Sequence, residues 1–239
     1  YCFDSLQRYD SCIYYATQIL KLDTLNDLAY YMRAFAQVNT NAWEAAMSDV
    51  QKAIELNSSV GDYFDIRGFI YDQNKKYELA IQDYNEAIRL LPKFARAYYH
   101  RGTTISNQFK NYAKAIGDYS TSISYDSTNA YAFYNRGIAY KKLKHYSNAL
   151  KDYTYCIKLE PHYVPAYYNR ALVYEAMNKP QKAIADYNAA LQIDPSDIET
   201  LFNCGILLMN FSKNYFEKFQ RRHYVDESIH FYDDNFNYW

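Results

Sequence analysis

Residues 130–163 read AYAFYNRGIAYKKLKHYSNALKDYTYCIKLEPHY, and residues 164–197 repeat this pattern with YYNRALVY, KAIADYNAAL and DP at matching places. Earlier copies of the pattern start at Asp27, Gly61 and Ala95, so the period is 34 or 35 residues. A fixed period of this size is typical of solenoids, because each unit is too small to bury its apolar face and must stack on neighbours. The spacing therefore predicts a row of similar stacked units.

Each copy is predicted to contain two helices. With Ala130 as position 1, aromatic residues recur at position 4 and small residues recur at positions 8 and 20. Positions 4, 8 and 11 share one face of a helix, and positions 20, 24 and 27 share one face of a second helix. Pro92, Pro161 and Pro195 fall where three of the copies end, since proline does not continue a helix. Each copy is thus predicted to be a helical hairpin.

This pattern resembles the tetratricopeptide repeat family, whose period and small/aromatic signature it matches over five full copies. The resemblance implies an all-α fold, a right-handed superhelical solenoid of antiparallel helix hairpins. The third copy needs one extra residue, expected in its inter-helix turn near residues 110–112. The expected division is a truncated repeat over 1–26, repeats over 27–60, 61–94, 95–129 (with the insertion), 130–163 and 164–197, and a degenerate repeat with an insertion or a capping helix over 198–239.

The last copy departs from the pattern after Met209. Residues 226–236, DESIHFYDDNF, scan like a second helix after an elongated first helix or long turn over residues 211–223. The alternative is one terminal capping helix without a hairpin. Because Tyr1 is not a methionine and Trp239 is an abrupt end, we expect the chain to be a fragment of a longer protein.

An arginine and an aspartate recur together in all five complete copies. We expect them to form a bidentate ion pair between the two helices of each hairpin. The arginines at position 7 are Arg33, Arg67, Arg101, Arg136 and Arg170, and the aspartates at position 23 are Asp49, Asp83, Asp118, Asp152 and Asp186. In the sixth copy Cys204 replaces the arginine, and Phe231 or Gln220 takes the place of the aspartate, depending on the alignment.

The resemblance implies a concave groove lined by positions 2, 5, 6, 9, 12 and 13 of the first helices. Asparagines recur at position 6 of the last three copies, and an amide side chain can satisfy the backbone of an extended peptide whatever its sequence. The candidate partner-binding residues are Asn135, Asn169, Asn203 and His100 at position 6, Tyr99, Tyr134, Tyr168 and Phe202 at position 5, and Ile138 and Leu172 at position 9. The same resemblance implies that Asp65 and Ile66, at positions 5 and 6 of the second copy, face the groove.

Several kinds of function have no support in the sequence. The formal net charge is -1, so no charge-driven attraction to nucleic acid is expected, and no apolar run approaches the roughly 20 residues of a membrane span. The cysteines and histidines show no metal spacing, and no catalytic motif is present, so we expect no enzyme activity, no metal and no cofactor. Positions 5, 6 and 9 also lack the lysine and arginine set that family members use to hold acidic chaperone C-terminal tails, so such tails are not expected as partners.

The sequence therefore favours a non-catalytic scaffold that binds a peptide segment or helix of another protein in a concave groove. One alternative is a structural subunit of a large ciliary or cytoskeletal assembly, and another is the regulatory repeat array of a longer enzyme. Cysteines placed as small core residues suit a reducing compartment, so we expect an intracellular, cytoplasmic location, with the cilium or cytoskeleton as a narrower option.

Overall fold

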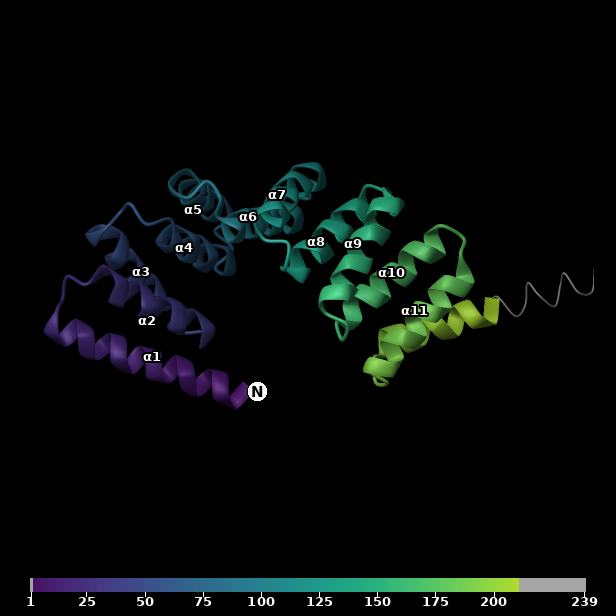
Figure 1. The fold of residues 1–239 in the computed structure, drawn as a ribbon, viewed down its shortest axis with the longest axis horizontal. Coiled ribbons are helices and arrows are strands. Elements are labelled where there is room, and N and C mark those ends of the chain that lie inside the picture. The colour runs from purple at the N-terminus through teal and green to yellow at the C-terminus, as the bar shows by residue number, and fades with distance from the viewer. Residues whose placement is uncertain (1, 211–239) are drawn as a thin grey trace, which may run out of the picture. The chain divides into compact units, whose positions relative to one another are not determined.

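Helices and short turns make up the part of the chain that the computed structural model describes, which is residues 2–210, with side chains described from residue 8. No strand occurs in that range, and Figure 1 shows the helices following one another as antiparallel pairs. The prediction of an all-α solenoid of helix hairpins is confirmed. The bounds are α1 (Cys2–Leu22), α2 (Asp27–Asn39), α3 (Trp43–Leu56), α4 (Gly61–Gln73), α5 (Tyr77–Leu90), α6 (Ala95–Asn107), α7 (Tyr112–Tyr125), α8 (Ala130–Lys142), α9 (Tyr146–Leu159), α10 (Val164–Ala176) and α11 (Pro180–Ile193), and residues 198–210 are also helical.

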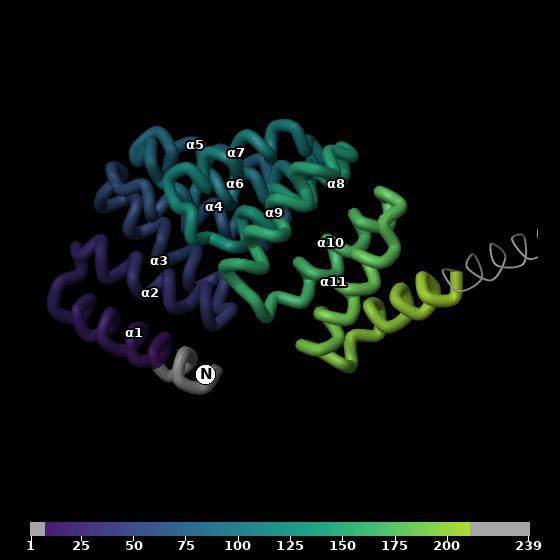
Figure 2. Tube along the Cα trace, turned by 45° about the vertical axis from the view of Figure 1, so that its right-hand side comes forward, coloured from purple at the N-terminus to yellow at the C-terminus, as the bar shows by residue number. Residues whose placement is uncertain are grey.

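The chain divides into two compact units, Tyr1–His145 and Tyr146–Trp239. Unit 1 holds α1 to α8, and unit 2 holds α9 to α11 and the helix over residues 198–210. In unit 1, α2 packs on α3, α4 on α5 and α6 on α7, and in unit 2, α10 packs on both α9 and α11. The trace in Figure 2 shows this succession from another side. The segments that the sequence assigned to 211–223 and 226–236 lie outside the described residues.

Capping side chains, prolines and turn residues account for where the helices begin and where the chain reverses direction. The side chains of Asn26, Asn111 and Asn129 each accept a hydrogen bond from a backbone N–H in the first turn of α2, α7 and α8. Pro165 and Pro180 lie in the first turn of α10 and α11, where no backbone donor is needed. Each reversal within a hairpin uses one residue with positive φ, and these residues are Asn41, Lys75, Lys110, Lys144 and Asn178.

The third hairpin has a longer turn than the second. Residues 108–111 connect α6 to α7, whereas residues 74–76 connect α4 to α5. The extra residue thus lies in the turn and leaves both helices at their usual length. Phe109 is exposed there, in the first half of the turn.

Small residues bring the two helices of a hairpin close together. A Cβ atom on Gly68 would lie 2.8 Å from the ring of Tyr84, and Ala80 on the facing helix is fully buried. Tyrosine at position 24 fills the space beside the small residues. The tyrosines buried in this way are Tyr84, Tyr119, Tyr153 and Tyr187.

Unit 1 curves with its first helices on the inside. Consecutive first helices contact each other directly, α2 with α4, α4 with α6 and α6 with α8. Among the described residues of unit 1, consecutive second helices make no contact of that extent. The concave face of unit 1 is therefore the face formed by α2, α4, α6 and α8.

Candidate functional site

The arginine at position 7 and the aspartate at position 23 lie in contact in four hairpins. In each, Nε and Nη2 of the arginine donate to the two carboxylate oxygens. The shortest N–O distances are 2.7 Å for Arg33–Asp49, 2.7 Å for Arg67–Asp83, 2.6 Å for Arg101–Asp118 and 2.7 Å for Arg170–Asp186. Arg136 belongs to unit 1 and Asp152, which is buried, to unit 2. Each of these four pairs joins the two helices of one hairpin.

Each of these arginines also makes contacts that sequence reasoning missed. The guanidinium of Arg101 lies 5.4 Å from the ring centroid of Tyr98, one turn earlier on α6, which is a cation–π distance. Its Nη1 donates to Asn85 Oδ1 on the second helix of the preceding hairpin at 2.6 Å. Three further arginines donate from Nη1 to a side-chain hydroxyl on the preceding helix. These bonds are Arg33 to Thr17, Arg136 to Ser120, and Arg170 to Thr154. A small polar residue at position 25 is the sequence signal that could have revealed this link between hairpins.

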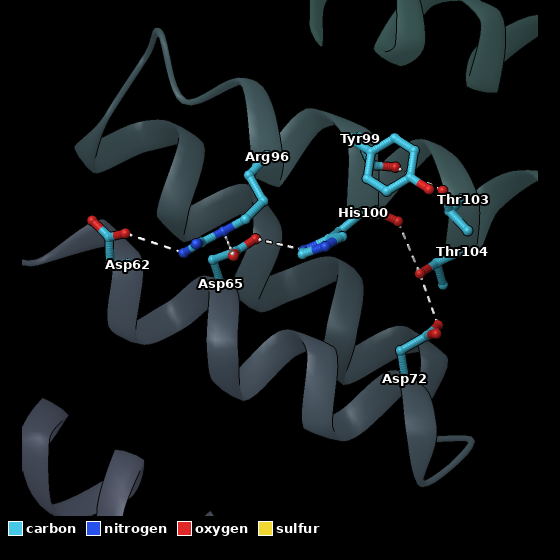
Figure 3. A network of polar contacts seen from close by, with 8 residues as sticks. All are labelled: Asp62, Asp65, Asp72, Arg96, Tyr99, His100, Thr103 and Thr104. Atoms are coloured by element: carbon cyan, nitrogen blue, oxygen red, sulfur yellow. Dashed lines mark hydrogen bonds and ion pairs between the residues drawn. The ribbon is translucent and has the colours of Figure 1, made fainter. Parts of the chain in front are cut away.

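A charged network connects α4 to α6 (Figure 3). Arg96 Nε donates to Asp65 Oδ2 at 2.6 Å, and its Nη2 donates to Asp62 Oδ1 at 3.1 Å. His100 Nδ1 lies 3.0 Å from Asp65 Oδ1. Asp65 is fully buried because Arg96 and His100 from the next hairpin cover it. Burial alone raises the pKa of Asp65, but the charges and hydrogen bonds of His100 and Arg96 hold it below its ordinary value.

This network corrects one expectation from the sequence. Positions 5 and 6 of the second copy were expected to face the groove, but Asp65 and Ile66 are both buried. The physical reason is that a carboxylate at position 5 recruits a cation from the next first helix, which then lies over it. His100, by contrast, keeps a partly exposed ring between the rings of Phe69, Tyr84 and Tyr99, with centroids 5.3 to 5.7 Å away.

Thr104 extends the polar network beyond His100. Its hydroxyl lies 2.7 Å from Asp72 Oδ1 and 3.2 Å from the backbone oxygen of His100, so α6 is held to α4 at a second point (Figure 3). On the exposed side of this network, the hydroxyl of Thr103 donates to the backbone oxygen of Tyr99. The α4–α6 interface of unit 1 is therefore held by charge and hydrogen bonds as well as by apolar packing.

Each asparagine at position 6 donates a hydrogen bond, either to the preceding first helix or to the backbone of its own helix. Asn135 Nδ2 on α8 donates to the hydroxyl of Tyr99 on α6 at 3.2 Å, and in unit 2 Asn203 Nδ2 donates to the hydroxyl of Tyr168 at 2.8 Å. Asn169 Nδ2 donates to the backbone oxygen of Pro165 on its own helix at 3.0 Å. In the described part of the chain, Oδ1 of Asn135 and Oδ1 of Asn203 accept no hydrogen bond. Each of these two amides is thus fixed in orientation by a tyrosine and keeps one acceptor.

The remaining candidate residues differ in the solvent exposure of their side chains. Tyr168 donates to Glu199 Oε1 at 2.8 Å, and burial with this hydrogen bond raises the pKa of Tyr168 to about 12, so its hydroxyl stays protonated. Tyr134, Ile138 and Leu172 are half-buried, whereas Phe202 has 67% of its surface exposed. The structure places Asn135, His100, Tyr99, Tyr134 and Ile138 in unit 1, and Asn169, Asn203, Tyr168, Phe202 and Leu172 in unit 2.

Among the side chains that the structure describes, no group of three or more His, Cys, Asp and Glu residues is arranged to hold a metal ion. No helix within residues 2–210 combines the length and apolarity that crossing a bilayer requires.

Comparison with known proteins agrees with the helix pairing. The profile of the tetratricopeptide repeat matches residues 130–163 and 164–197, and a related TPR repeat profile matches residues 68–108 and 107–144. Human Tetratricopeptide repeat protein 6 is 33% identical over 86 residues, which are 36% of this chain and 16% of that protein. The chain therefore aligns with a small part of the length of this relative.

Solved structures show the same fold at low sequence identity. YrrB, described as a TPR protein with an unusual peptide-binding site, has a TM-score of 0.64 and 20% identity, with 79% of this chain and 96% of YrrB covered. A chain of the APC/C hetero-tetramer Cut9–Hcn1 has a TM-score of 0.75 and 19% identity, with 84% of this chain and 40% of that chain covered. The repeat profiles, the helix pairing and these similarities agree, and the chain belongs to the tetratricopeptide repeat family.

Proposed function

We propose that this chain is a non-catalytic scaffold that binds an extended segment of a partner protein along the concave face of unit 1. The observation that carries the proposal is the hydrogen bond from Asn135 to Tyr99, which fixes the amide and leaves Oδ1 to accept from a partner. A backbone N–H of an extended peptide is a suitable donor for that oxygen, because it is present at every residue of the partner except proline.

Apolar side chains on the same face add contact area. Leu28 and Met32 on α2 are 55% and 41% exposed, and both occupy positions that the family uses for its groove. A partner segment that buries such side chains gains about 25 cal/mol for each Å² of apolar surface removed from water. We therefore expect a segment with apolar side chains at intervals, held by its backbone at Asn135. YrrB, which shares the fold, is described as having a peptide-binding site, and this supports a peptide as the kind of partner.

A peptide library tests this function. A phage-displayed library of dodecapeptides would be selected on the full chain, and the dissociation constant of a selected peptide would be measured with Asn135→Ala and with Asn148→Ala. Asn148 is exposed on α9 and serves as the matched control. Loss of one hydrogen bond predicts about fivefold weaker binding for Asn135→Ala and no change for the control. Equal binding by wild type and Asn135→Ala would contradict the proposal.

A second candidate function is a structural subunit of a larger assembly. The observation that favours it is the exposed aromatic pair Tyr14 and Tyr15 on α1, with ring centroids 5.3 Å apart. Clustered exposed aromatic side chains are typical of protein interfaces. If this function holds, Tyr15→Ala would release the chain from a stable complex purified from its source, whereas Asn135→Ala would not.

A further inference from the structure

A pocket lies where the longer turn of the third hairpin meets α5 of the second hairpin. Its volume is about 440 Å³, which is within the range of about 300–1,000 Å³ that is typical of ligand-binding pockets. Its apolar lining comes from Ile81 on α5, Ile105 on α6 and Phe109 in the turn. Ile105 is buried, whereas Phe109 is 45% exposed, so the ring of Phe109 is open to contact from outside.

The extra residue of the third copy accounts for the position of Phe109. In the second hairpin one residue, Asn74, separates the end of α4 from Lys75, which has positive φ. In the third hairpin two residues, Gln108 and Phe109, separate the end of α6 from the positive-φ residue Lys110. The insertion therefore adds an aromatic ring before the reversal, at a place where the second hairpin has no residue.

Exposed lysines lie in and beside this pocket. The two turns with their adjoining helix ends, residues 72–78 and 107–114, contain four lysines and two carboxylates. Asp72 accepts a hydrogen bond from Thr104, and Glu78 lines the pocket. The four lysines, which we call the lysine edge, are all exposed, and none makes an ion pair with a described residue: Lys75, Lys76, Lys110 and Lys114. Because the whole chain has a formal net charge of -1, positive charge is concentrated at this edge.

The turn conformation does not account for these lysines. Lys75 and Lys110 have φ of 60° and 53°, in the left-handed region that glycine and asparagine adopt most readily. The first and fifth reversals have asparagine at this place, Asn41 and Asn178. Lys144, in the reversal after α8, is a third exposed lysine with positive φ. The backbone thus favours a different residue type, and the ammonium group is better explained by a contact outside the hairpin.

We propose that the lysine edge binds an acidic protein segment that inserts one aromatic side chain into the pocket beside Phe109. Carboxylates of the segment would contact the lysines, which gives the complementary charge that steers and orients a partner. An aromatic anchor in an apolar pocket is the kind of contact that supplies most of the affinity in protein interfaces. This surface uses α5, α7 and a turn, so it is separate from the concave face and from Asn135.

A nucleic acid fits this surface less well. A phosphate backbone binds where cations follow it without interruption, and the carboxylate of Glu78 lies in the pocket between the two turns. An acidic protein segment can place an uncharged residue next to Glu78 and its carboxylates next to Lys110 and Lys114. The mixture of apolar lining, one carboxylate and several lysines therefore favours a protein.

Fluorescence anisotropy with the full chain tests the proposal. The probe is a fluorescein-labelled dodecapeptide of Asp and Glu with one central Phe. We expect Phe109→Ala to weaken binding about tenfold, because it removes the ring that the anchor contacts. The matched control is Tyr125→Ala, at the far end of α7, because Tyr125 is also 45% exposed; this variant should bind as wild type does.

Lysine substitutions test the charge. Lys114→Gln should weaken binding about threefold at low salt and have less effect at high salt, since exposed charges are screened. Lys93→Gln, which changes an exposed lysine in the turn between α5 and α6, should leave binding unchanged. Equal effects of the two substitutions would mean that the peptide responds to overall charge and would overturn the proposal.

Other outcomes overturn the proposal as well. Wild-type binding that is absent up to about 1 mM peptide, or unchanged when alanine replaces the phenylalanine of the peptide, would exclude the aromatic anchor. Tighter binding of a single-stranded oligothymidylate of the same length would mean that nucleic acid is the ligand. Asn135→Ala should leave peptide binding unchanged, and weaker binding by this variant would place the peptide on the concave face instead.

Discussion

Arg67 and Asp83 join α4 to α5 through two parallel hydrogen bonds, Nε to Oδ2 at 2.7 Å and Nη2 to Oδ1 at 2.8 Å. The two side chains are 17% and 8% exposed, so the pair lies mostly out of water. A pair of this kind contributes little compared with an apolar pair of the same shape, but removing one partner leaves the other charge buried. Its effect on stability therefore appears when one partner is changed.

Asp83→Asn is expected to lower the free energy of unfolding by about 3 kcal/mol, because it leaves the guanidinium of Arg67 without its carboxylate. Chemical denaturation monitored by circular dichroism measures the change. The control is Glu86→Gln, which breaks an exposed pair with Arg89 on the same helix and is expected to leave the midpoint unchanged. Equal effects of the two substitutions would contradict the structural role of the Arg67–Asp83 pair.

Asn85→Ala is expected to destabilise the chain by about 1 kcal/mol, since Arg101 loses its hydrogen bond to the preceding hairpin. Gln51 occupies the same position one hairpin earlier, and within the described residues it makes no such bond to Arg67. Gln51→Ala is therefore expected to have no measurable effect in the same denaturation experiment. A loss of stability for Gln51→Ala as large as that for Asn85→Ala would show that the hydrogen bond to Arg101 is not the cause.

Two glycines are expected to respond to alanine in opposite directions. Gly68→Ala should destabilise by about 1–3 kcal/mol, because the new Cβ would lie 2.8 Å from the buried ring of Tyr84. Gly117→Ala should stabilise by about 0.5–1 kcal/mol, because Gly117 lies within α7 and nothing is within 4 Å of the new atom. Thermal denaturation of the two variants checks both signs, and a shift in the same direction for both would be inconsistent with this packing.

Acid is expected to weaken the α4–α6 interface through Asp65. The pKa of Asp65 is lowered in the folded chain, so below the unfolded value of about 3.9 the unfolded chain takes up a proton more readily than the folded chain. The contribution of Asp65 to stability is thus present above that pH and is lost as pH falls through the folded pKa. Asp65→Asn should be less stable than wild type at pH 7, and the two melting temperatures should converge below about pH 4. A constant difference from pH 7 to pH 2.5 would exclude this linkage.

Periodicity in the sequence was sufficient to predict the helix hairpins. The small residues at positions 8 and 20 mark the two faces that meet, and they do so because only a small side chain lets the backbones approach, as at Gly68 and Ala80. The arginine and aspartate recur in register, so the sequence suggested the contact that the structure shows for Arg33 and Asp49. These features repeat in all five complete copies and are therefore visible in one sequence.

Contacts that occur in only one copy leave no repeating pattern in the sequence, so they could not be predicted from it. Asp65 was expected in the groove because its position faces the groove elsewhere, but its partners Arg96 and His100 lie 31 and 35 residues away and cover it. The bond from Asn135 to Tyr99 spans 36 residues and depends on how adjacent hairpins stack. Contacts between copies depend on stacking geometry, which periodicity alone does not determine.

Binding of a partner segment on the concave face of unit 1 can be followed by an NMR titration of the isotopically labelled full chain with a selected peptide. Binding on this face predicts chemical-shift changes at α6 and α8, including the side-chain amide of Asn135, with smaller changes at α5 and α7. Changes concentrated on α5 and α7, with the Asn135 amide unmoved, would contradict it.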